Sequence, residues 1–362
     1  MKTSPATIVF IVPSLSQPRC IKRVVSICDS GYNCVVYGYH RGIYDVNTFP
    51  EYVPVHTLGE MDNGKVFDNL RTMRKDVKNI ITENGNDCVY YCFGMLSAAL
   101  FASKGVRYIY EISDIPYAYP RYEKLIFLLK ALDRRIIDHS LLTVMTSGGF
   151  KKYLKADGDK IVLQPNRVSA LLKGTNRTPL ALTENRFRFA FIGAIRYNTV
   201  FKFAEVVGKE FPQHEFHFYG GAKAETLEKV EELVKTYENI EYHGLFKSPG
   251  DLVSIYKNVD IVIACYDIAS QNERILEPNK LYESLCFCKP IVVSDGTYLA
   301  DRVKELQCGF VLDGQNQHEI SSFIKQIDLE EVIEISQRNA LLQEGEYIDD
   351  VTMLTTKIHS LF

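Results

Sequence analysis

The chain has 362 residues, of which 46 % are hydrophobic and 24 % charged, and its formal net charge is −3. These are the values of an ordinary globular protein, and they exclude a disordered chain, a coiled coil and a fibrous repeat. At about 150 residues per domain, the length predicts two domains.

The first half of the chain alternates short β-branched and aromatic runs with segments of helical period. We predict six strands in it: Thr7–Val12, Asn33–Tyr37, Asp87–Cys92, Tyr108–Glu111, Leu142–Thr146 and Lys160–Leu163. Helices are expected between them, most clearly at Lys65–Glu83 and Arg121–Asp138. Strands that alternate with helices are typical of a parallel sheet with crossover helices.

The same alternation restarts in the second half. The strands predicted there are Phe187–Ile192, Glu215–Tyr219, Ile240–Tyr242, Ile261–Cys265, Ile291–Ser294 and Gly309–Leu312. Helices are expected at about Phe201–Glu210, Ala224–Tyr237, Gly250–Asn258, Asn279–Phe287, Tyr298–Gln307 and His318–Gln326. Two such series predict an α/β protein with two doubly wound parallel-sheet domains, and not a single barrel.

The boundary between the domains is expected in the polar, aperiodic stretch 168–185. We assign residues 1–170 to an N-terminal domain, 171–185 to a linker and 186–340 to a C-terminal domain. Residues 341–362 are predicted to be helical, and they either cap the second domain or cross back to the first. Ligands of open parallel sheets bind beyond the carboxyl ends of the strands, so a cleft between the domains is the expected site.

The nine cysteines are odd in number, scattered and without a C-x-x-C pair. They are typical of buried thiols in a reducing cytosol, and neither disulfides nor a zinc site are predicted from them. No window holds about 18 consecutive apolar residues, and the apolar run that ends at Val12 is too short for a signal peptide. We therefore expect a cytoplasmic protein, either free or peripheral on the inner face of a membrane.

Charge is divided unevenly along the chain. Residues 1–180 carry 24 Lys and Arg against 16 Asp and Glu, and the remainder carries 18 against 29. The first half is therefore expected to face an anionic membrane surface or a phosphate-bearing substrate, and the alternative is a solvated surface with a chance excess of basic residues. No basic stripe is interleaved with stacking aromatics, so nucleic acid is not predicted as a partner. The basic, Leu-rich segment 117–138 fits either a helix lying on anionic lipid or a buried crossover helix.

The most informative segment is Leu276–Ser294. Pro278 and Asn279 favour the start of a helix, and Lys280 and Glu283 are three residues apart, so they share one helical face. A helix N-terminus suits a phosphate, and a carboxylate one turn inside can accept hydrogen bonds from two hydroxyls of a ribose or sugar. By spacing alone, a capped helix with a surface Lys–Glu pair is the favoured interpretation.

This segment resembles the donor-site motif of the retaining glycosyltransferases of family 4, which have the GT-B fold of two Rossmann-like domains facing across a cleft. The Pro-Asn-Lys-Leu-Tyr-Glu run at 278–283 carries the resemblance. It implies that the carboxylate of Glu283 holds the ribose hydroxyls of a nucleotide. The family has a second Glu eight residues earlier that contacts the donor sugar. Ile275 stands at that place, and Glu277 or Glu273 is the candidate to replace it.

Three further stretches resemble the same family in order and spacing. Phe191–Arg196 is similar to its glycine loop, where Gly193 lets the donor phosphates approach the backbone. The resemblance implies that Arg196 and Lys202 contact the diphosphate. Residues 165–168 resemble the interdomain hinge, and 146–154 resemble the strand end and helix just before it.

Polar candidates for the acceptor side lie after strands of the first domain. Ser16, Gln17 and Arg19 follow the first strand, and Gly94 follows the third. Asp114 stands near the place where the family often has a His, and it is a candidate to bind an acceptor hydroxyl or to act as a base. Capping of a helix by Asp114 is the alternative.

No metal site is predicted, because the eight histidines show neither metal-ligand nor triad spacing and no D-x-D pair ends a strand. His243 is expected to pack or to border the donor pocket. The GT-B resemblance also implies that no cofactor or metal is required, since a helix N-terminus and basic groups stabilise the leaving diphosphate.

These observations predict a glycosyltransferase of hexosyltransferase type. It would move a sugar from a nucleotide-diphosphate donor, a UDP-sugar, to a hydroxyl of a saccharide or lipid-linked saccharide in cell-surface polysaccharide synthesis. Retention of the anomeric configuration is implied by the resemblance alone. Two alternatives stay open: a nucleotide-sugar 2-epimerase of the same fold, and a catalytically silent nucleotide- or sugar-binding protein.

Overall fold

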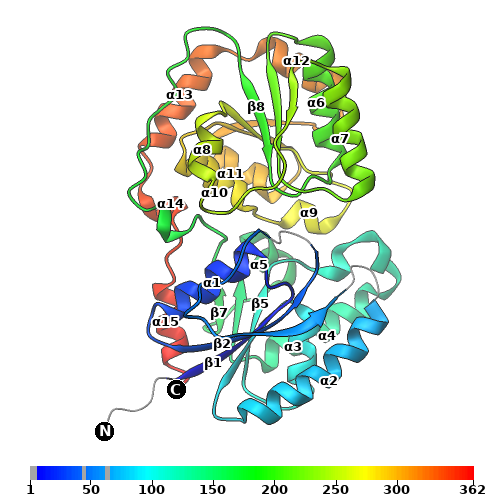
Figure 1. Cartoon of the computed structure of the whole chain (residues 1–362), viewed down its shortest axis with the longest axis vertical. Helices are drawn as coiled ribbons and strands as arrows, with labels where there is room; N and C mark the ends of the chain where they lie inside the picture. The colour runs from blue at the N-terminus through cyan, green and yellow to red at the C-terminus, as the bar shows by residue number, and fades with distance from the viewer. Residues whose placement is uncertain (1–5, 43–45, 62–65) are drawn as a thin grey trace. The chain divides into compact units, whose positions relative to one another are not determined.

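The computed structural model describes residues 6–42, 46–61 and 66–362. The chain forms two compact units, unit 1 with Met1–Pro165 and Asp350–Phe362, and unit 2 with Asn166–Asp349. Each unit is a parallel β-sheet covered by helices (Figure 1). The prediction of two doubly wound α/β domains is therefore confirmed.

The sheet of unit 1 has the strand order β3-β2-β1-β4-β5-β6-β7, and every pair of neighbours is parallel. Its strands are β1 (Thr7–Val12), β2 (Asn33–His40), β3 (Val55–Glu60), β4 (Val89–Phe93), β5 (Tyr108–Ile112), β6 (Leu142–Met145) and β7 (Ile161–Leu163). Strand β3 was not predicted, because its side chains are mostly exposed and it contains no apolar run.

The helices of unit 1 are α1 (Pro18–Cys28), α2 (Val66–Asn84), α3 (Met95–Ala102), the 3₁₀ turns η1 (Pro116–Ala118) and η2 (Pro120–Leu125), α4 (Ile126–His139), α5 (Gly148–Leu154) and α15 (Thr352–His359). The helix predicted over Arg121–Asp138 thus begins as a 3₁₀ turn and becomes α-helical at Ile126. The buried side of α4 centres on Asp133, which accepts hydrogen bonds from the hydroxyls of Tyr110 and Tyr117 at 2.9 and 2.7 Å.

The C-terminal helix α15 belongs to unit 1 (Figure 1). Leu354 and Ile358 are fully buried in the same apolar cluster as strands β1 and β4. Lys357 donates to the carbonyl of Asp159 at 2.6 Å, and Tyr32 donates to that of Thr355 at 3.0 Å. Apolar burial together with these hydrogen bonds fixes the end of the chain on this unit.

Unit 2 has the strand order β10-β9-β8-β11-β12-β13, again with parallel neighbours only. Its strands are β8 (Arg188–Ile192), β9 (Glu215–Tyr219), β10 (Ile240–Tyr242), β11 (Ile261–Ala264), β12 (Ile291–Ser294) and β13 (Gly309–Leu312). Its helices are η3 (Ala170–Leu172), α6 (Asn198–Glu210), α7 (Ala224–Thr236), α8 (Leu252–Lys257), α9 (Gln271–Ile275), α10 (Asn279–Cys286), α11 (Tyr298–Leu306), α12 (Gln317–Gln326), α13 (Leu329–Ala340) and α14 (Glu344–Tyr347).

The strand order of unit 2 reverses between β8 and β11, with α6 and α7 on one face of the sheet and α8 and α10 on the other (Figure 1). The chain segments that follow two such strands diverge to opposite faces and leave room for a ligand at their carboxyl ends. The turn after β8 holds Gly193, and the segment after β11 leads to α10. The two motifs singled out in the sequence therefore meet at the switch point of the sheet.

Residues 171–185, which the sequence analysis assigns to a linker, lie within unit 2. Leu172 and Leu180 are buried in its apolar core. The guanidinium of Arg177 donates to the backbone carbonyls of Leu285, Asn339, Ala340 and Leu342. Hydrogen bonds from a side chain to the ends of α10 and α13 hold this stretch in place. It therefore needs no repeating apolar face, and its sequence shows neither a helical nor a strand period.

All nine cysteines are free thiols, and all except Cys28 are buried. Of the helices in the described parts of the chain, none combines the length and the apolar character that crossing a bilayer requires.

Candidate functional site

The turn after β8 contains Gly193, so it presents backbone atoms without a side chain at the switch point. Gly193 has a φ of 136°, in the region that favours glycine, and its N–H donates to the carbonyl of Tyr219 at 2.7 Å. A Cβ at Gly193 would lie 2.7 Å from Nζ of Lys280. A side chain at this position would therefore displace the ammonium group.

Lys280 lies in the first turn of α10, and only 6 % of it is exposed. Its Nζ lies 4.6 Å from the ring centre of Phe191 and 5.7 Å from that of Tyr266. Among the described residues it has no hydrogen bond and no ion pair within 4 Å. Burial, with help from nearby Arg196 and against the attraction of Glu283, lowers the pKa of the ammonium to about 8. A buried cation without an anionic partner is costly, which is typical of a site that receives an anion.

Glu283 lies one turn further along α10 and is also buried, with 4 % exposed. Its carboxylate accepts a hydrogen bond from the hydroxyl of Tyr256 at 2.8 Å and another from the side-chain amide of Asn279. The ring of Tyr256 stacks on Phe287 with centres 4.5 Å apart, which fixes the direction of its hydroxyl. These contacts hold the carboxylate in one orientation, as selective binding of a diol requires.

The N-termini of α6 and α10 differ in their caps. The carboxylate of Asp267 accepts hydrogen bonds from the backbone N–H groups of Asn198 and Thr199, at 3.1 and 3.0 Å, at the start of α6. Helix α10 begins after Pro278 and has no side-chain cap. The positive end of α6 is thus already neutralised by a carboxylate of the protein. The first turn of α10 has no such carboxylate cap, and it contains the ammonium of Lys280.

Arg196 follows the glycine turn, and its exposed side chain lies beside an aromatic ring. Its guanidinium donates to the hydroxyl of Tyr197 at 2.6 Å and lies 4.9 Å from the centre of that ring. Tyr197 packs against Tyr266, with ring centres 4.4 Å apart. After burial, the positive charge of Arg196 also contributes to lowering the pKa of Lys280.

Three of the predicted donor residues have internal partners. Lys202 donates to the carbonyl of Gln315 at 2.8 Å. Glu277 is buried and accepts hydrogen bonds from Tyr282 at 2.5 Å and from Arg302 at 3.2 Å. Glu273 is buried and hydrogen-bonded to Ser270, the residue that caps α9. Gly193, Asn279, Lys280 and Glu283 are therefore the candidates that the structure brings together, with Arg196 beside them.

The acceptor-side candidates all follow strands of unit 1. Ser16 is buried, with its hydroxyl 3.3 Å from that of Ser14. Gln17 directly precedes α1 and accepts a weak hydrogen bond from Cys20, and Arg19 lies in the first turn of that helix. Gly94 has a φ of 88° and caps α3. Asp114 is half-buried after β5. Burial lowers the pKa of Arg41, and the charge of Asp114 opposes this effect.

Sequence reasoning missed the aromatic residues of the site. Tyr266 follows β11, Tyr197 precedes α6 and Tyr256 lies in α8, so they are far apart in the chain. Nothing in their local spacing sets them apart from the other tyrosines, of which the sequence has 22 in all. The arrangement as a whole offers a buried cation, an uncapped helix start and an oriented carboxylate, which together suit a phosphate group linked to a diol.

Comparison with known proteins places this arrangement in a family context. Residues 173–341, most of unit 2, match the model of the family described as Glycosyl transferases group 1. No curated protein sequence shows significant similarity to the chain.

Solved structures resemble the chain over nearly its whole length. Sucrose-phosphate synthase from Thermosynechococcus elongatus superposes with a TM-score of 0.75 at 12 % identity, covering 98 % of each chain. HepE from Anabaena, solved with UDP and glucose, gives 0.69 at 13 % identity and 98 % of each chain. TarM from S. aureus, solved with UDP, gives 0.65 at 10 % identity, covering 98 % of this chain and 99 % of the other.

These likenesses establish the GT-B fold that the sequence predicts. Unit 2 matches a glycosyltransferase group 1 domain, and together with the GT-B neighbours this match supports the prediction that the chain is a glycosyltransferase.

Proposed function

We propose that this protein transfers a sugar from a nucleoside-diphosphate donor to a hydroxyl of a saccharide or lipid-linked saccharide, in the manner of the retaining glycosyltransferases of family 4. The observation that carries the proposal is the buried ammonium of Lys280, which faces Gly193 and lies one helical turn from the carboxylate of Glu283. UDP is the proposed nucleotide, because HepE and TarM, which share the fold, were solved with it. Synthesis of cell-surface polysaccharide is the proposed setting.

In this proposal each residue has a defined role. Lys280 and the first N–H groups of α10 bind the diphosphate, and Arg196 adds charge where the leaving group gains it. Glu283 accepts hydrogen bonds from the two ribose hydroxyls. The bond between the sugar and the diphosphate breaks as the acceptor oxygen bonds to the same carbon. Asp114 is the candidate to hold or deprotonate the acceptor hydroxyl, with Ser16, Gln17, Arg19 and Gly94 on the acceptor side.

The proposal is tested by measuring UDP binding and UDP release with a panel of UDP-sugars, with and without saccharide acceptors. We expect UDP to raise the melting temperature and slow release of UDP even without acceptor. Arg196→Ala is expected to lower kcat about tenfold with little change in the Kd of UDP. The exposed charge of Arg196 is screened by solvent, so it adds little to ground-state binding and acts mainly on the negative charge that the leaving group gains in the transition state.

A Lys209→Ala variant, which removes an exposed cation at the far end of α6, is the matched control and should leave kcat unchanged. Absence of any UDP binding would refute the proposal. Formation of an epimeric UDP-sugar without acceptor would instead point to an epimerase, and binding without turnover to a silent binding protein.

We also propose that unit 1 attaches to an anionic membrane surface through α4. Four apolar side chains of η2 and α4 face outward: Leu125 is 50 % exposed, Phe127 90 %, Leu128 68 % and Leu132 42 %. The same segment carries five exposed basic residues: Arg121, Lys124, Lys130, Arg134 and Arg135. Exposed apolar side chains and cations on one segment match the interface of an anionic bilayer, where each cation contributes about 1 kcal/mol.

Sedimentation with phosphatidylglycerol vesicles tests this attachment. Phe127→Ser combined with Leu128→Ser should weaken vesicle binding at least about tenfold, because two large apolar contacts are lost. Leu341→Ser, which alters an equally exposed leucine of unit 2, should bind as the wild type does. Equal binding to neutral and anionic vesicles, or unchanged binding of the double variant, would contradict the proposal.

A further inference from the structure

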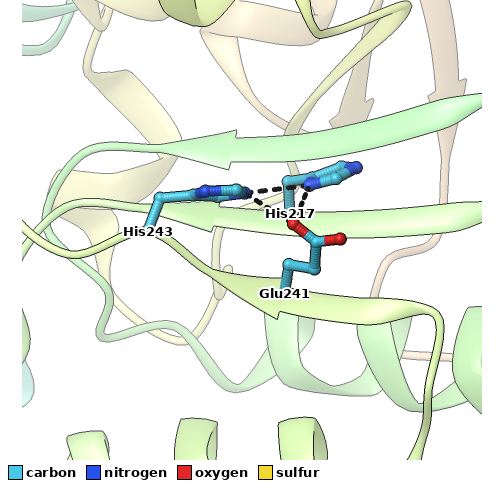
Figure 2. A group of neighbouring side chains, drawn as sticks. All are labelled: His217, Glu241 and His243. Carbon is cyan, nitrogen blue, oxygen red and sulfur yellow. Dashed lines mark hydrogen bonds and ion pairs between the residues drawn. The ribbon is translucent and has the colours of Figure 1, made fainter.

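A second cluster of polar side chains lies on one face of the unit 2 sheet, at the edge formed by β9 and β10. His217 of β9 and Glu241 of β10 are register partners in the parallel pair, and His243 follows the end of β10. Figure 2 shows the two imidazoles and the carboxylate turned toward one another. Strand pairing thus joins groups that have no ligand spacing in the sequence, which is why the sequence analysis predicts no metal site.

The three facing atoms have the separations of a metal-ligand set. Nδ1 of His217 lies 2.9 Å from Nε2 of His243, and Oε2 of Glu241 lies 3.7 and 3.5 Å from these two nitrogens. In the plane of these three atoms, the point equidistant from them lies about 2.0 Å from each, which is the bond length that zinc makes to imidazole nitrogen and carboxylate oxygen. Two imidazoles and one carboxylate are also a ligand set that zinc adopts in proteins when a fourth position is left open.

Outer contacts orient both rings. Nε2 of His217 lies 3.2 Å from Oε2 of Glu215, whose other oxygen pairs with Arg186 at 2.5 Å. A nitrogen that donates to a carboxylate leaves the opposite ring nitrogen with its lone pair, and such carboxylate–histidine pairs commonly support a bound metal. The ring of His243 stacks on Tyr219 with centres 4.2 Å apart and 8° between planes. Both imidazoles are therefore fixed before any ion arrives.

Space for the remaining ligand is provided by a cavity of about 350 Å³ on this face of the sheet. The cluster lines it together with Arg188 from β8 and with Ser254 and Asn258 from the α8 region. Arg188 is paired with Asp260 at 2.8 Å and so does not add an unpaired cation to the cavity. The side chains of Glu241 and His243 are 58 % and 32 % exposed, so an ion can reach the cluster from solvent.

We propose that His217, Glu241 and His243 bind a divalent transition metal ion of the zinc class, with water or a small anion in its fourth position. Glu215 is the positioning residue for His217. The ion would join β9 to the short edge strand β10. This site goes beyond the sugar transfer proposed above, whose proposed donor residues include none of these ligands.

The test uses the untagged full-length chain, stripped of metal with a chelator and then titrated with Zn²⁺ and Co²⁺. We expect one equivalent of Zn²⁺ per chain by calorimetry, a rise in melting temperature, and the intense visible absorption that four-coordinate Co²⁺ shows. Glu241→Gln and His243→Ala change exposed side chains, so they should fold, and each should weaken Zn²⁺ binding at least about tenfold. Glu215→Gln should also weaken Zn²⁺ binding about tenfold or more, because Glu215 then no longer orients the ring of His217 as a carboxylate.

His318→Ala removes an exposed histidine elsewhere in unit 2 and is the control. Its Zn²⁺ affinity should equal that of the wild type. Failure of the wild-type chain to bind Zn²⁺, or binding that persists unchanged in a Glu241→Gln/His243→Ala double variant, would overturn the proposal.

Discussion

Lys280→Met is expected to weaken UDP binding by about 10²–10³-fold while leaving the affinity for uridine unchanged. The ammonium lies buried at the glycine turn, and no residue in the described part of the chain offers it an anionic partner within 4 Å, so a bound diphosphate would supply its counter-charge. Uridine carries no phosphate and gains nothing from this group. Methionine keeps the length and apolar packing of the stem, so the loss reports the charge.

The affinity for UDP should depend on pH through the titration of Lys280. The pKa of Lys280 is lowered to about 8 in the folded protein, so the ammonium loses its proton as the pH rises above that value. Wild-type affinity for UDP should then fall, toward about tenfold per pH unit, and Lys280→Met should show no such decline. Calorimetric titrations on both sides of pH 8 measure both effects.

Stability should change in the opposite direction from binding. A lysine with a lowered folded-state pKa costs stability below that pKa, and the cost disappears as the pH rises through it toward the unfolded value of 10.5. Lys280→Met should therefore be more stable than the wild type at pH 7, by on the order of 3 kcal/mol.

Lys289→Met is the matched control for UDP binding. Lys289 is also buried, but it lies beside Asp260 at the opposite ends of the strands. Loss of UDP affinity in this control, or none in Lys280→Met, would remove Lys280 from the site.

The fold was largely predictable because buried parallel strands leave a strong local signal. The predicted strands Glu215–Tyr219 and Ile240–Tyr242 agree with β9 and β10 to the residue. What escaped prediction depends on contacts across the chain. Strand β3 is an exposed edge strand, and α9 is a single short turn stabilised by Ser270 and Glu273. Neither has the apolar period on which sequence reasoning depends.

The donor site was predictable only in part, for the same reason. Lys280, Asn279 and Glu283 fall within five residues of one helix, so their shared face follows from helical geometry. Glu277 was a candidate because it lies two residues from Ile275, which stands where the family has its second Glu, yet Glu277 is held by Arg302 and Tyr282. The aromatic rings that surround Lys280 come from β8 and from the segment after β11, and only the paired strands show that they meet.

Glu283→Gln is expected to weaken UDP binding by about 100-fold, since exchanging a charged for a neutral acceptor costs about 1–1.5 kcal/mol for each of the two ribose hydrogen bonds. The decisive comparison is with 2′-deoxy-UDP. The wild type should prefer UDP strongly, and Glu283→Gln should lose most of that preference, because the hydroxyl has then lost its charged partner. Tyr256→Phe is the control: it removes the donor at 2.8 Å from the carboxylate but keeps the charge, so it should retain the preference.

Glu283 also acts on Lys280, whose pKa it raises against the effect of burial. Removing the carboxylate charge should lower the pKa of Lys280 further, so the decline of UDP affinity with rising pH should begin below pH 8 in Glu283→Gln. A purely structural carboxylate would leave the 2′-hydroxyl preference unchanged, even if its loss destabilised the fold or moved this onset. Retention of the full preference for UDP over 2′-deoxy-UDP in Glu283→Gln would place the ribose elsewhere, and the donor-site assignment of α10 would then be wrong.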